Sequence, residues 1–174
     1  AAVGTPSQGQ GHATTLAQVV AHELGVRVED VAVAAGDTTA APVSTAGTRA
    51  SRVATVIGGA LALAARRLRA RLLEAAAAAL GRDGTDGLAL VDGVVRADGR
   101  ARLTLRELAE AAHFDPATRA RLGDGELVVT QHYDPPATYS NGAIAAVVDV
   151  DLGTGGVAVR RLAVVEDCGT MLNP

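Results

Sequence analysis

The sequence is poor in several residue types, and each shortage excludes something. Among its 174 residues there is one cysteine, Cys168, so an internal disulfide is excluded and a reducing compartment fits. Lysine is absent, which rules out a phosphate-binding loop built around a lysine. Tryptophan is absent too and aromatic residues make up only 2%, so the core must consist of small aliphatic side chains, mainly alanine and valine.

Charge and hydropathy narrow the class of protein further. The net charge of −3 gives no basic surface for nucleic acid. No basic leader is visible, and the longest uncharged apolar stretch, residues 53–65, is too short to cross a bilayer. We therefore expect a cytoplasmic protein without a membrane span. Since the chain begins without methionine and stops after a strand-like run, we also expect a fragment of a larger subunit.

Hydrophobic periodicity predicts an α+β fold with mixed, mostly antiparallel strands and one long helix. Helices are predicted at residues 14–24, 51–80 and 103–112, and strands at residues 26–35, 88–91, 94–96, 127–132, 143–152 and 157–166. We interpret residues 1–174 as part of one domain, with a possible subdomain break in the turn-rich residues 81–87. Gly58 and Gly59 inside the long helix each cost about 1 kcal/mol relative to alanine. The close approach of another backbone segment at this point of the helix would explain why glycines are present despite this cost.

Local signals mark several element ends. Gly25 follows the first helix as a left-handed C′ glycine would. Asp92-Gly93 is a typical two-residue hairpin turn. Thr104 and Glu107 have the spacing of a capping box, in which each side chain accepts a hydrogen bond from the other residue's backbone N–H. These signals predict a hairpin followed by a short helix.

The first candidate binding segment is Gly9-Gln10-Gly11-His12, directly before a helix. Glycines on both sides of Gln10 allow the backbone to approach a ligand closely. The carboxamide of Gln10 offers donors and an acceptor, and the helix N-terminus that follows favours an anion. The alternative interpretation is an ordinary flexible loop before a helix.

The second candidate segment opens the long helix and consists of Gly47, Thr48, Arg49, Ala50, Ser51 and Arg52. Either Thr48 or Ser51 has the right side chain to cap the helix. The remaining N–H groups and the two arginines would attract an anion. The alternative is an ordinary N-cap with solvated arginines. Two helix starts of this kind in one small domain favour a phosphate-bearing ligand between them.

Other reactive side chains give weaker signals. No histidine has thiols or carboxylates at metal-ligand spacing, and this holds for His12, His22, His113 and His132. We therefore expect no metal bound directly by the protein. Cys168 is expected to be a buried structural thiol, and Asp37 a turn residue. No Ser-His-Asp arrangement and no dinucleotide-binding fingerprint is present.

Several segments carry a more specific signal together. They are residues 9–15, the strand end at 36–38, residues 47–52, residues 133–136 (Tyr-Asp-Pro-Pro), and the closing residues 167–174 (Asp-Cys-Gly-Thr-Met-Leu-Asn-Pro). In this order they resemble the molybdopterin-binding large subunits of molybdenum hydroxylases, the xanthine dehydrogenase, aldehyde oxidase and aerobic carbon-monoxide dehydrogenase family. The last two segments resemble bacterial members related to carbon-monoxide dehydrogenase.

The resemblance implies a set of cofactors and partners. Such subunits bind a molybdenum-molybdopterin cofactor, in bacteria usually as the cytosine dinucleotide. In the family, the glutamine matching Gln10 lies beside the molybdenum and hydrogen-bonds its ligands, and the loop matching residues 47–51 brings backbone N–H groups against the cofactor. Electrons pass to two [2Fe–2S] clusters and to FAD on partner subunits. A hetero-oligomer is therefore expected.

The resemblance also implies an activity, with two departures. The family oxidises small molecules such as aldehydes, N-heterocycles or carbon monoxide with oxygen derived from water. Here Arg49-Ala50 replaces an aromatic-glycine pair of one branch, so the substrate class does not carry over. The family's catalytic glutamate lies in a later motif that this sequence does not contain. We therefore name no catalytic residue and expect the fragment alone to be inactive. The alternatives are a cofactor-fold module without turnover and an unrelated phosphate-binding domain.

Overall fold

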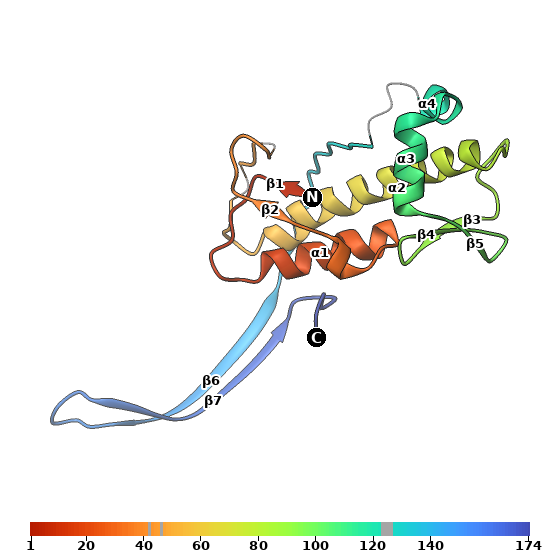
Figure 1. The fold of residues 1–174 in the computed structure, drawn as a ribbon. Coiled ribbons are helices and arrows are strands. Elements are labelled where there is room, and N and C mark those ends of the chain that lie inside the picture. The colour runs from red at the N-terminus through yellow and green to blue at the C-terminus, as the bar shows by residue number, and fades with distance from the viewer. Residues whose placement is uncertain (42, 46, 123–126) are drawn as a thin grey trace. The chain divides into compact units, whose positions relative to one another are not determined.

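Two helices that lie side by side organise the first part of the protein, α1 (His12–Leu24) and α2 (Gly59–Ala79) (Figure 1). The computed structural model describes residues 1–41, 43–45, 47–122 and 127–174, which divide into two units, Ala1–Pro135 and Pro136–Pro174. α1 begins two residues earlier than expected, and Gly25 ends it with a φ of 85°, which confirms the predicted C-terminal glycine.

The predicted long helix is present, but its beginning differs from the expectation. It opens with a π-helical turn, Val53–Gly58, and becomes α-helical at Gly59. Neither predicted cap is made: Ser51 has a φ of 52°, and an N-cap residue is extended instead. The Thr48 hydroxyl instead donates to the Pro6 carbonyl oxygen, in the loop before α1.

The predicted strand at residues 26–35 is mostly wrong. A short 3₁₀ turn occupies Val28–Asp30, and only β2 (Ala34–Ala35) pairs, in parallel with β1 (Ala2–Val3). The alternating valines lie on an irregular segment, and Val33 packs against the buried side chains of Val3 and Leu16. The alternation of valines in residues 26–35 therefore reflects the burial of one side of an irregular segment, and not a paired strand.

The hairpin and cap predictions are confirmed. β3 (Leu88–Val91), β4 (Val94–Ala97) and β5 (Arg100–Thr104) form an antiparallel sheet, and both Asp92 and Gly93 have positive φ, as their turn requires. Thr104 and Glu107 form the capping box of α3 (Leu105–Phe114), which is followed by α4 (Pro116–Leu122). The prediction missed β5, because the expected helix start at residue 103 lies inside it, and it also missed α4.

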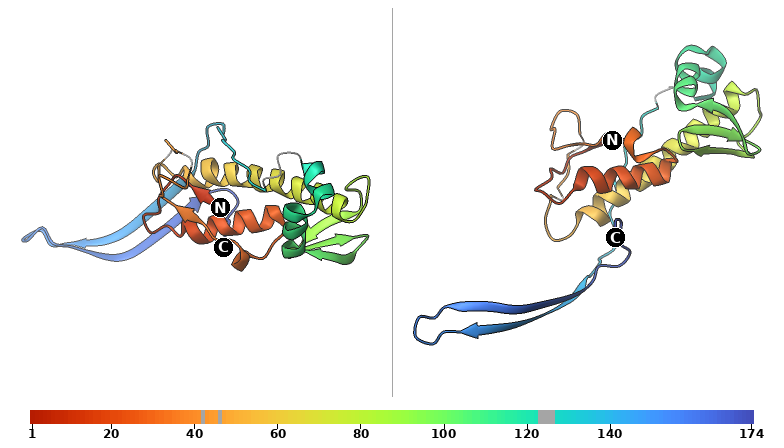
Figure 2. Two further views of the ribbon diagram at one scale, coloured as in Figure 1. Left: turned by 45° about the horizontal axis from the view of Figure 1, so that its top comes forward. Right: turned by 60° about the horizontal axis from the view of Figure 1, so that its bottom comes forward.

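Small side chains build the main core, as the composition requires. Leu72, Ala75 and Ala76 of α2 pack against Leu90 of β3 and Leu108 of α3. The three alanines Ala75, Ala76 and Ala77 are fully buried, so the alanine run lies against its neighbours with no room for larger residues. Figure 2 shows the β3–β5 sheet and helices α3 and α4 gathered around the C-terminal end of α2.

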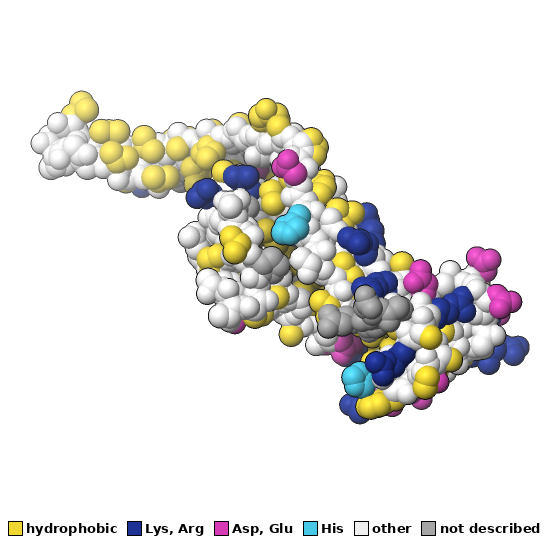
Figure 3. Space-filling model, turned by 90° about the horizontal axis from the view of Figure 1, so that it is seen from above, with side chains coloured by type: hydrophobic (Ala, Val, Ile, Leu, Met, Phe, Trp, Pro, Cys, Tyr) yellow, Lys and Arg dark blue, Asp and Glu magenta, His cyan; other side chains and the backbone are white. Residues whose placement is uncertain are grey.

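The second unit is an antiparallel ribbon of β6 (Asn141–Val150) and β7 (Val157–Asp167), which confirms the two predicted strands. Its aliphatic side chains are exposed, and Figure 3 shows them along the ribbon. Arg160 forms an ion pair with Asp149 across the strands. Cys168 is exposed, so the expectation of a buried thiol was wrong. Helices, hairpin and ribbon together confirm the α+β class with mostly antiparallel strands.

Candidate functional site

The loop before α1 has the backbone expected of a ligand-binding turn. Gly9 and Gly11 have φ values of 105° and 74°, and a Cβ at either position would meet no atom within 4 Å. The space beside the backbone is therefore open. Gln10 is exposed, and its side-chain oxygen accepts a hydrogen bond of 2.7 Å from the backbone N–H of Gln8. The Gln10 side chain is thus held over its own loop.

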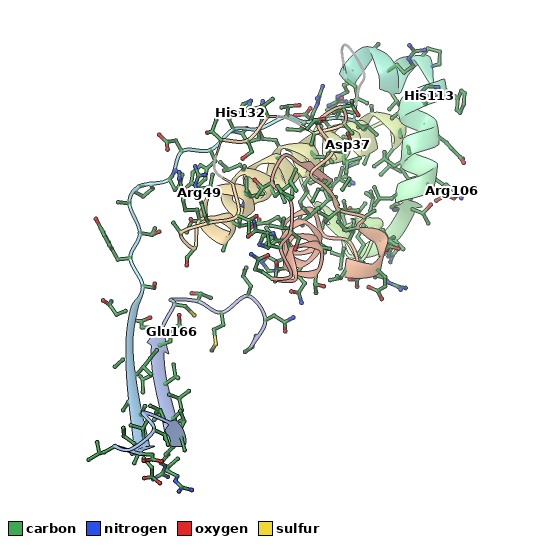
Figure 4. The ribbon with its side chains drawn as sticks, turned by 90° about the vertical axis from the view of Figure 1, so that its left-hand side faces the viewer. Asp37, Arg49, Arg106, His113, His132 and Glu166 are labelled. Carbon is green, nitrogen blue, oxygen red and sulfur yellow. The ribbon has the colours of Figure 1, made fainter. Side chains whose placement is uncertain are left out.

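The loop before α2 stores backbone strain. Ala50 and Ser51 have φ values of 53° and 52°, in the left-handed region that costs an L-residue roughly 1–2 kcal/mol. Arg52 is exposed, and its guanidinium has no partner in the described part of the chain. Arg49, labelled in Figure 4, is also exposed and donates a hydrogen bond to the carbonyl oxygen of Thr45. One arginine of this loop is therefore tied to the backbone and the other is free to meet an anion.

The fold brings these two loops to the same end of the helix pair. Leu16 of α1 packs with Val53 and Ile57, near the starts of both helices, while Glu23 pairs with Arg66 at 2.6 Å further along. The helices therefore run parallel, with both N-termini at one end (Figures 1 and 2). No side chain caps either helical start. Their free N–H groups and aligned dipoles favour negative charge there.

His12 is the one predicted site residue with a buried side chain. It is 7% exposed, and its Nδ1 atom has no hydrogen-bond partner in the described residues. A buried nitrogen without a partner costs about 1–3 kcal/mol. His12 follows Gly11 directly, so this unsatisfied group lies at the start of α1, beside the open glycine loop.

Two carboxylates of the first unit, one at each end of the helix pair, act as structural groups. The Arg66 guanidinium hydrogen-bonds Glu23 and thereby lowers the pKa of that carboxyl. The pKa of Asp37 is lowered because its carboxylate accepts hydrogen bonds from Thr39 and from the backbone of Ala40, as expected of a turn residue. The described residues contain no group of three or more histidine, cysteine or acidic side chains able to hold a metal ion.

A cavity of about 540 Å³ in the first unit was not predicted. It lies between β1, α2 and residues 127–133. The sequence predicted a strand at residues 127–132, but these residues pair with no strand in the described chain. The ring of Tyr133 lies against Gly59, where a Cβ would come within 2.4 Å of it. The glycine pair signalled a close approach, but an aromatic ring makes the approach and not another backbone.

Comparison with known proteins agrees with this architecture. The whole chain, residues 1–174, matches the family described as the molybdopterin cofactor-binding domain. The chain therefore belongs to that family and, as its motifs indicated, to the group of molybdenum hydroxylase large subunits. No helix in the described part of the chain is long and apolar enough to cross a membrane.

Three similar proteins illustrate the relationship. The carbon-monoxide dehydrogenase large chain of Hydrogenophaga pseudoflava is 41% identical over all of this chain and 21% of its own length. The crystal structure of quinoline 2-oxidoreductase from Pseudomonas putida 86 superposes with a TM-score of 0.78 at 37% identity, covering 98% of this chain and 22% of that one. Reconstituted carbon-monoxide dehydrogenase from Oligotropha carboxidovorans superposes with a TM-score of 0.79 at 37% sequence identity. This match covers 98% of this chain and 21% of that one. The chain thus spans about a fifth of their length.

Proposed function

We propose that residues 9–12 and 47–52 form part of the molybdopterin site in the large subunit of a molybdenum hydroxylase. One observation carries this proposal: two parallel helices without side-chain caps begin beside each other, each after a glycine-containing loop. A ligand with phosphate groups would bind the N–H groups that neither helix satisfies internally. The family to which the chain belongs makes molybdopterin the ligand of choice. We propose its cytosine dinucleotide form.

The residues fit this cofactor chemically. Gly9 and Gly11 leave room for a ligand to contact the backbone. Arg52 offers a cation that has no partner among the described residues, and Gln10 offers a carboxamide on the exposed side of its loop. The buried Nδ1 atom of His12 would find in a bound ligand the partner that it lacks. Thr48, Arg49, Ala50 and Ser51 shape the second loop around the same ligand.

When bound, molybdopterin would supply the redox chemistry that transfers water-derived oxygen to a small substrate. The chain's own residues position it: Gln10 would hydrogen-bond groups beside the metal, while the loop at residues 47–52 holds the anionic end. We assign no proton transfer to this chain, because the family's catalytic glutamate belongs to a later motif. Carbon monoxide, N-heterocycles and aldehydes all stay candidate substrates, since relatives of nearly equal similarity act on different molecules by their names.

The partners follow from the same proposal. An iron–sulfur subunit with two [2Fe–2S] clusters and an FAD subunit would accept the electrons in a cytoplasmic hetero-oligomer. Residues 1–174 alone would show no turnover, because they provide only part of the wall around the cofactor.

The subdomain break at residues 81–87 also stays a prediction. In the structure these residues form the turns that lead from α2 to β3.

Two substitutions in the full subunit test the site. Arg52→Ala should lower the molybdenum and pterin retained after dialysis, whereas Arg102→Ala, an exposed arginine on β5, should not. Gln10→Ala should keep the cofactor but lower turnover about 100-fold or more, the usual loss of one well-placed hydrogen-bonding group. Gln8→Ala is its matched control. Normal retention by the first variant together with normal turnover by the second would contradict the proposed site.

The alternative function, a cofactor-fold or phosphate-binding module without turnover, makes a different prediction. Such a protein would hold pterin or another phosphate compound and reduce no dye with aldehydes, N-heterocycles or carbon monoxide. Metal analysis of the complex, combined with that dye assay, separates the two functions. Full molybdenum content without any turnover would favour the alternative.

A further inference from the structure

The cavity beneath residues 127–133 is the feature that the proposed cofactor site leaves unexplained. Its floor is a stripe of apolar side chains on the π-helical turn and α2, formed by Ile57 of the turn and by Ala60, Leu61, Ala64 and Leu68 of α2. These residues recur every three or four positions, so one face of the helix is apolar along the whole cavity. β1 and the flanking residues Ala40 and 43–45 form one wall, and residues 127–133 form the other.

Residues 127–133 are held on α2 by side chains and not by a neighbouring strand. Arg71 donates to the carbonyl oxygen of Val128 at 3.1 Å, Arg67 donates to the side chain of Gln131 at 2.7 Å, and Tyr133 lies against Gly59. From residue 71 to residue 59 the helix rises about 18 Å. The chain from Val128 to Tyr133 covers such a distance only when it is nearly extended.

The backbone of this segment lacks strand partners. Within the described part of the chain, no N–H group of residues 128–133 donates to a backbone carbonyl. Two of its carbonyl oxygens accept hydrogen bonds from side chains, that of Val128 from Arg71 and that of His132 from Gln131. The backbone N–H groups, which have no backbone acceptor among the described residues, are available for pairing, as at the edge of a β-sheet. The sequence predicted a strand at residues 127–132, and the segment has the alternating side chains of one: Leu127, Val129 and Gln131 are half-buried, while Val128, Thr130 and His132 are exposed (Figure 4 shows His132).

The opposite wall presents a second free edge. β1 pairs with β2 through the carbonyl oxygens of Ala1 and Val3, which accept hydrogen bonds from Ala34 and Gly36. In a parallel ladder the backbone groups of the intervening residue, Ala2, point to the other side. Ala2 lines the cavity. Two strand edges therefore flank one apolar helical floor.

We propose that an extended β-strand from another part of the same large subunit occupies this cavity, between β1 and residues 127–133. An inserted strand would satisfy both edges with backbone hydrogen bonds and bury its apolar side chains on α2, as in other strand additions. The described lining contains no arginine, aspartate or glutamate, so it suits apolar peptide better than a charged small molecule.

The same subunit is the expected source of the strand. This chain corresponds to about a fifth of the length of its relatives, so the remaining length offers many such segments. A strand supplied within one polypeptide also binds without the entropy cost of association between chains. The inference rests on the proposal that the chain forms part of a large subunit, but it does not depend on which residues hold the cofactor.

Hydrogen exchange of the complete subunit, read by mass spectrometry, tests the insertion without any substitution. We expect amides of residues 128–133 to exchange at least about 100-fold more slowly than unstructured chain, as paired strands do. Exchange at the unstructured rate would overturn the proposal. Because this measurement reports backbone protection and not cofactor content, its failure is distinct from failure of the proposed function.

A pair of variants then tests whether the proposed inserted strand binds to the apolar side chains of the cavity floor. Ala64→Glu places a carboxylate on the floor, whereas Ala70→Glu places one on the exposed side of α2. Only the first should accelerate exchange at residues 128–133, by about 10-fold or more. Protection at Ala75–Ala77 in both variants checks that the subunit remains folded. Equal exchange at residues 128–133 in the two folded variants would contradict the docking.

A photo-reactive side chain at the exposed position of Thr130 identifies the source of the strand, with the same group at Ala70 as the control. The expected cross-link joins residue 130 to a segment of the same polypeptide outside residues 1–174. A cross-link to a second copy or to a partner subunit, or none above the control, would overturn the assignment to the same chain.

Discussion

The hydroxyl of Thr48 donates a hydrogen bond to the carbonyl oxygen of Pro6 and thereby joins the loop that precedes α2 to the loop that precedes α1. A second bond, from the Thr5 hydroxyl to the Ser44 hydroxyl at 3.1 Å, supports the same junction. The two loops that we propose to hold the cofactor are therefore fixed to one another directly. Their relative position does not depend on helix packing alone.

Removal of this junction should weaken cofactor retention. Thr48→Val keeps the shape of the side chain but cannot donate to Pro6, which costs about 0.5–1.5 kcal/mol, or roughly 2–10-fold in affinity. The measurement is the molybdenum retained by the full subunit after dialysis. Thr85→Val, at an exposed threonine in the turn before β3, is the matched control. Equal retention by both variants would show that the junction is dispensable.

The strained position of Ala50 should be improved by glycine. At a φ of 53°, Ala50→Gly removes steric strain, because glycine has no Cβ and adopts this left-handed backbone readily. We expect the subunit to gain about 0.5–1 kcal/mol, seen as a higher midpoint of thermal unfolding. Ala70→Gly in the exposed middle of α2 should instead lose about 1 kcal/mol. Destabilisation by both changes would contradict the left-handed conformation.

Two adjacent glycines, Gly58 at the end of the π-helical turn and Gly59 at the start of α2, should respond differently to alanine. A Cβ at Gly59 would lie 2.4 Å from the Tyr133 ring, whereas at Gly58 the nearest atom is 3.9 Å away. Gly58→Ala should therefore stabilise the helix by up to about 1 kcal/mol. Gly59→Ala should displace Tyr133 and release the end of residues 127–133, which limited proteolysis detects. In the double variant Gly59→Ala/Tyr133→Ala the new Cβ no longer meets the Tyr133 ring. The double variant should therefore show the gain in helix stability that Gly59→Ala alone does not.

The ion pair between Glu23 and Arg66 predicts a pH dependence. Because Arg66 lowers the pKa of Glu23 in the folded state, the pair stabilises the protein above the pKa of the unfolded carboxyl, about 4.3. That stability is lost as the pH falls through the lower, folded pKa. Since Arg66 is largely exposed, the effect should be no more than about 1 kcal/mol.

Thermal unfolding of Arg66→Gln and of wild-type protein measures this dependence. The difference in midpoint should be largest above pH 6 and should shrink below about pH 4, where the folded carboxyl takes up its proton. Arg106→Gln, at an exposed arginine of α3 that has no partner within the described chain, should give a small difference at every pH. A constant difference for Arg66→Gln would exclude Glu23 as the titrating partner.

Features that depend on neighbours in the sequence were predictable. The C-terminal glycine of α1, the Asp92-Gly93 hairpin and the capping box at Thr104 each follow from contacts within a few residues, and all three are present. The ribbon of β6 and β7 was predictable for a similar reason, because a short turn fixes which strands pair. The two candidate loops were also identifiable, from glycine and arginine patterns and from their resemblance to a known family.

Only the tertiary structure decided how distant segments meet. Whether residues 127–133 pair as a strand depends on partners far away in the chain, and the same alternating pattern serves a free edge as well as a paired one. The left-handed backbone of Ala50 and Ser51, the bond from Thr48 to Pro6, and the buried, unsatisfied Nδ1 atom of His12 likewise come from packing between segments. Sequence alone determined which residues could bind a ligand, and long-range contacts brought them together.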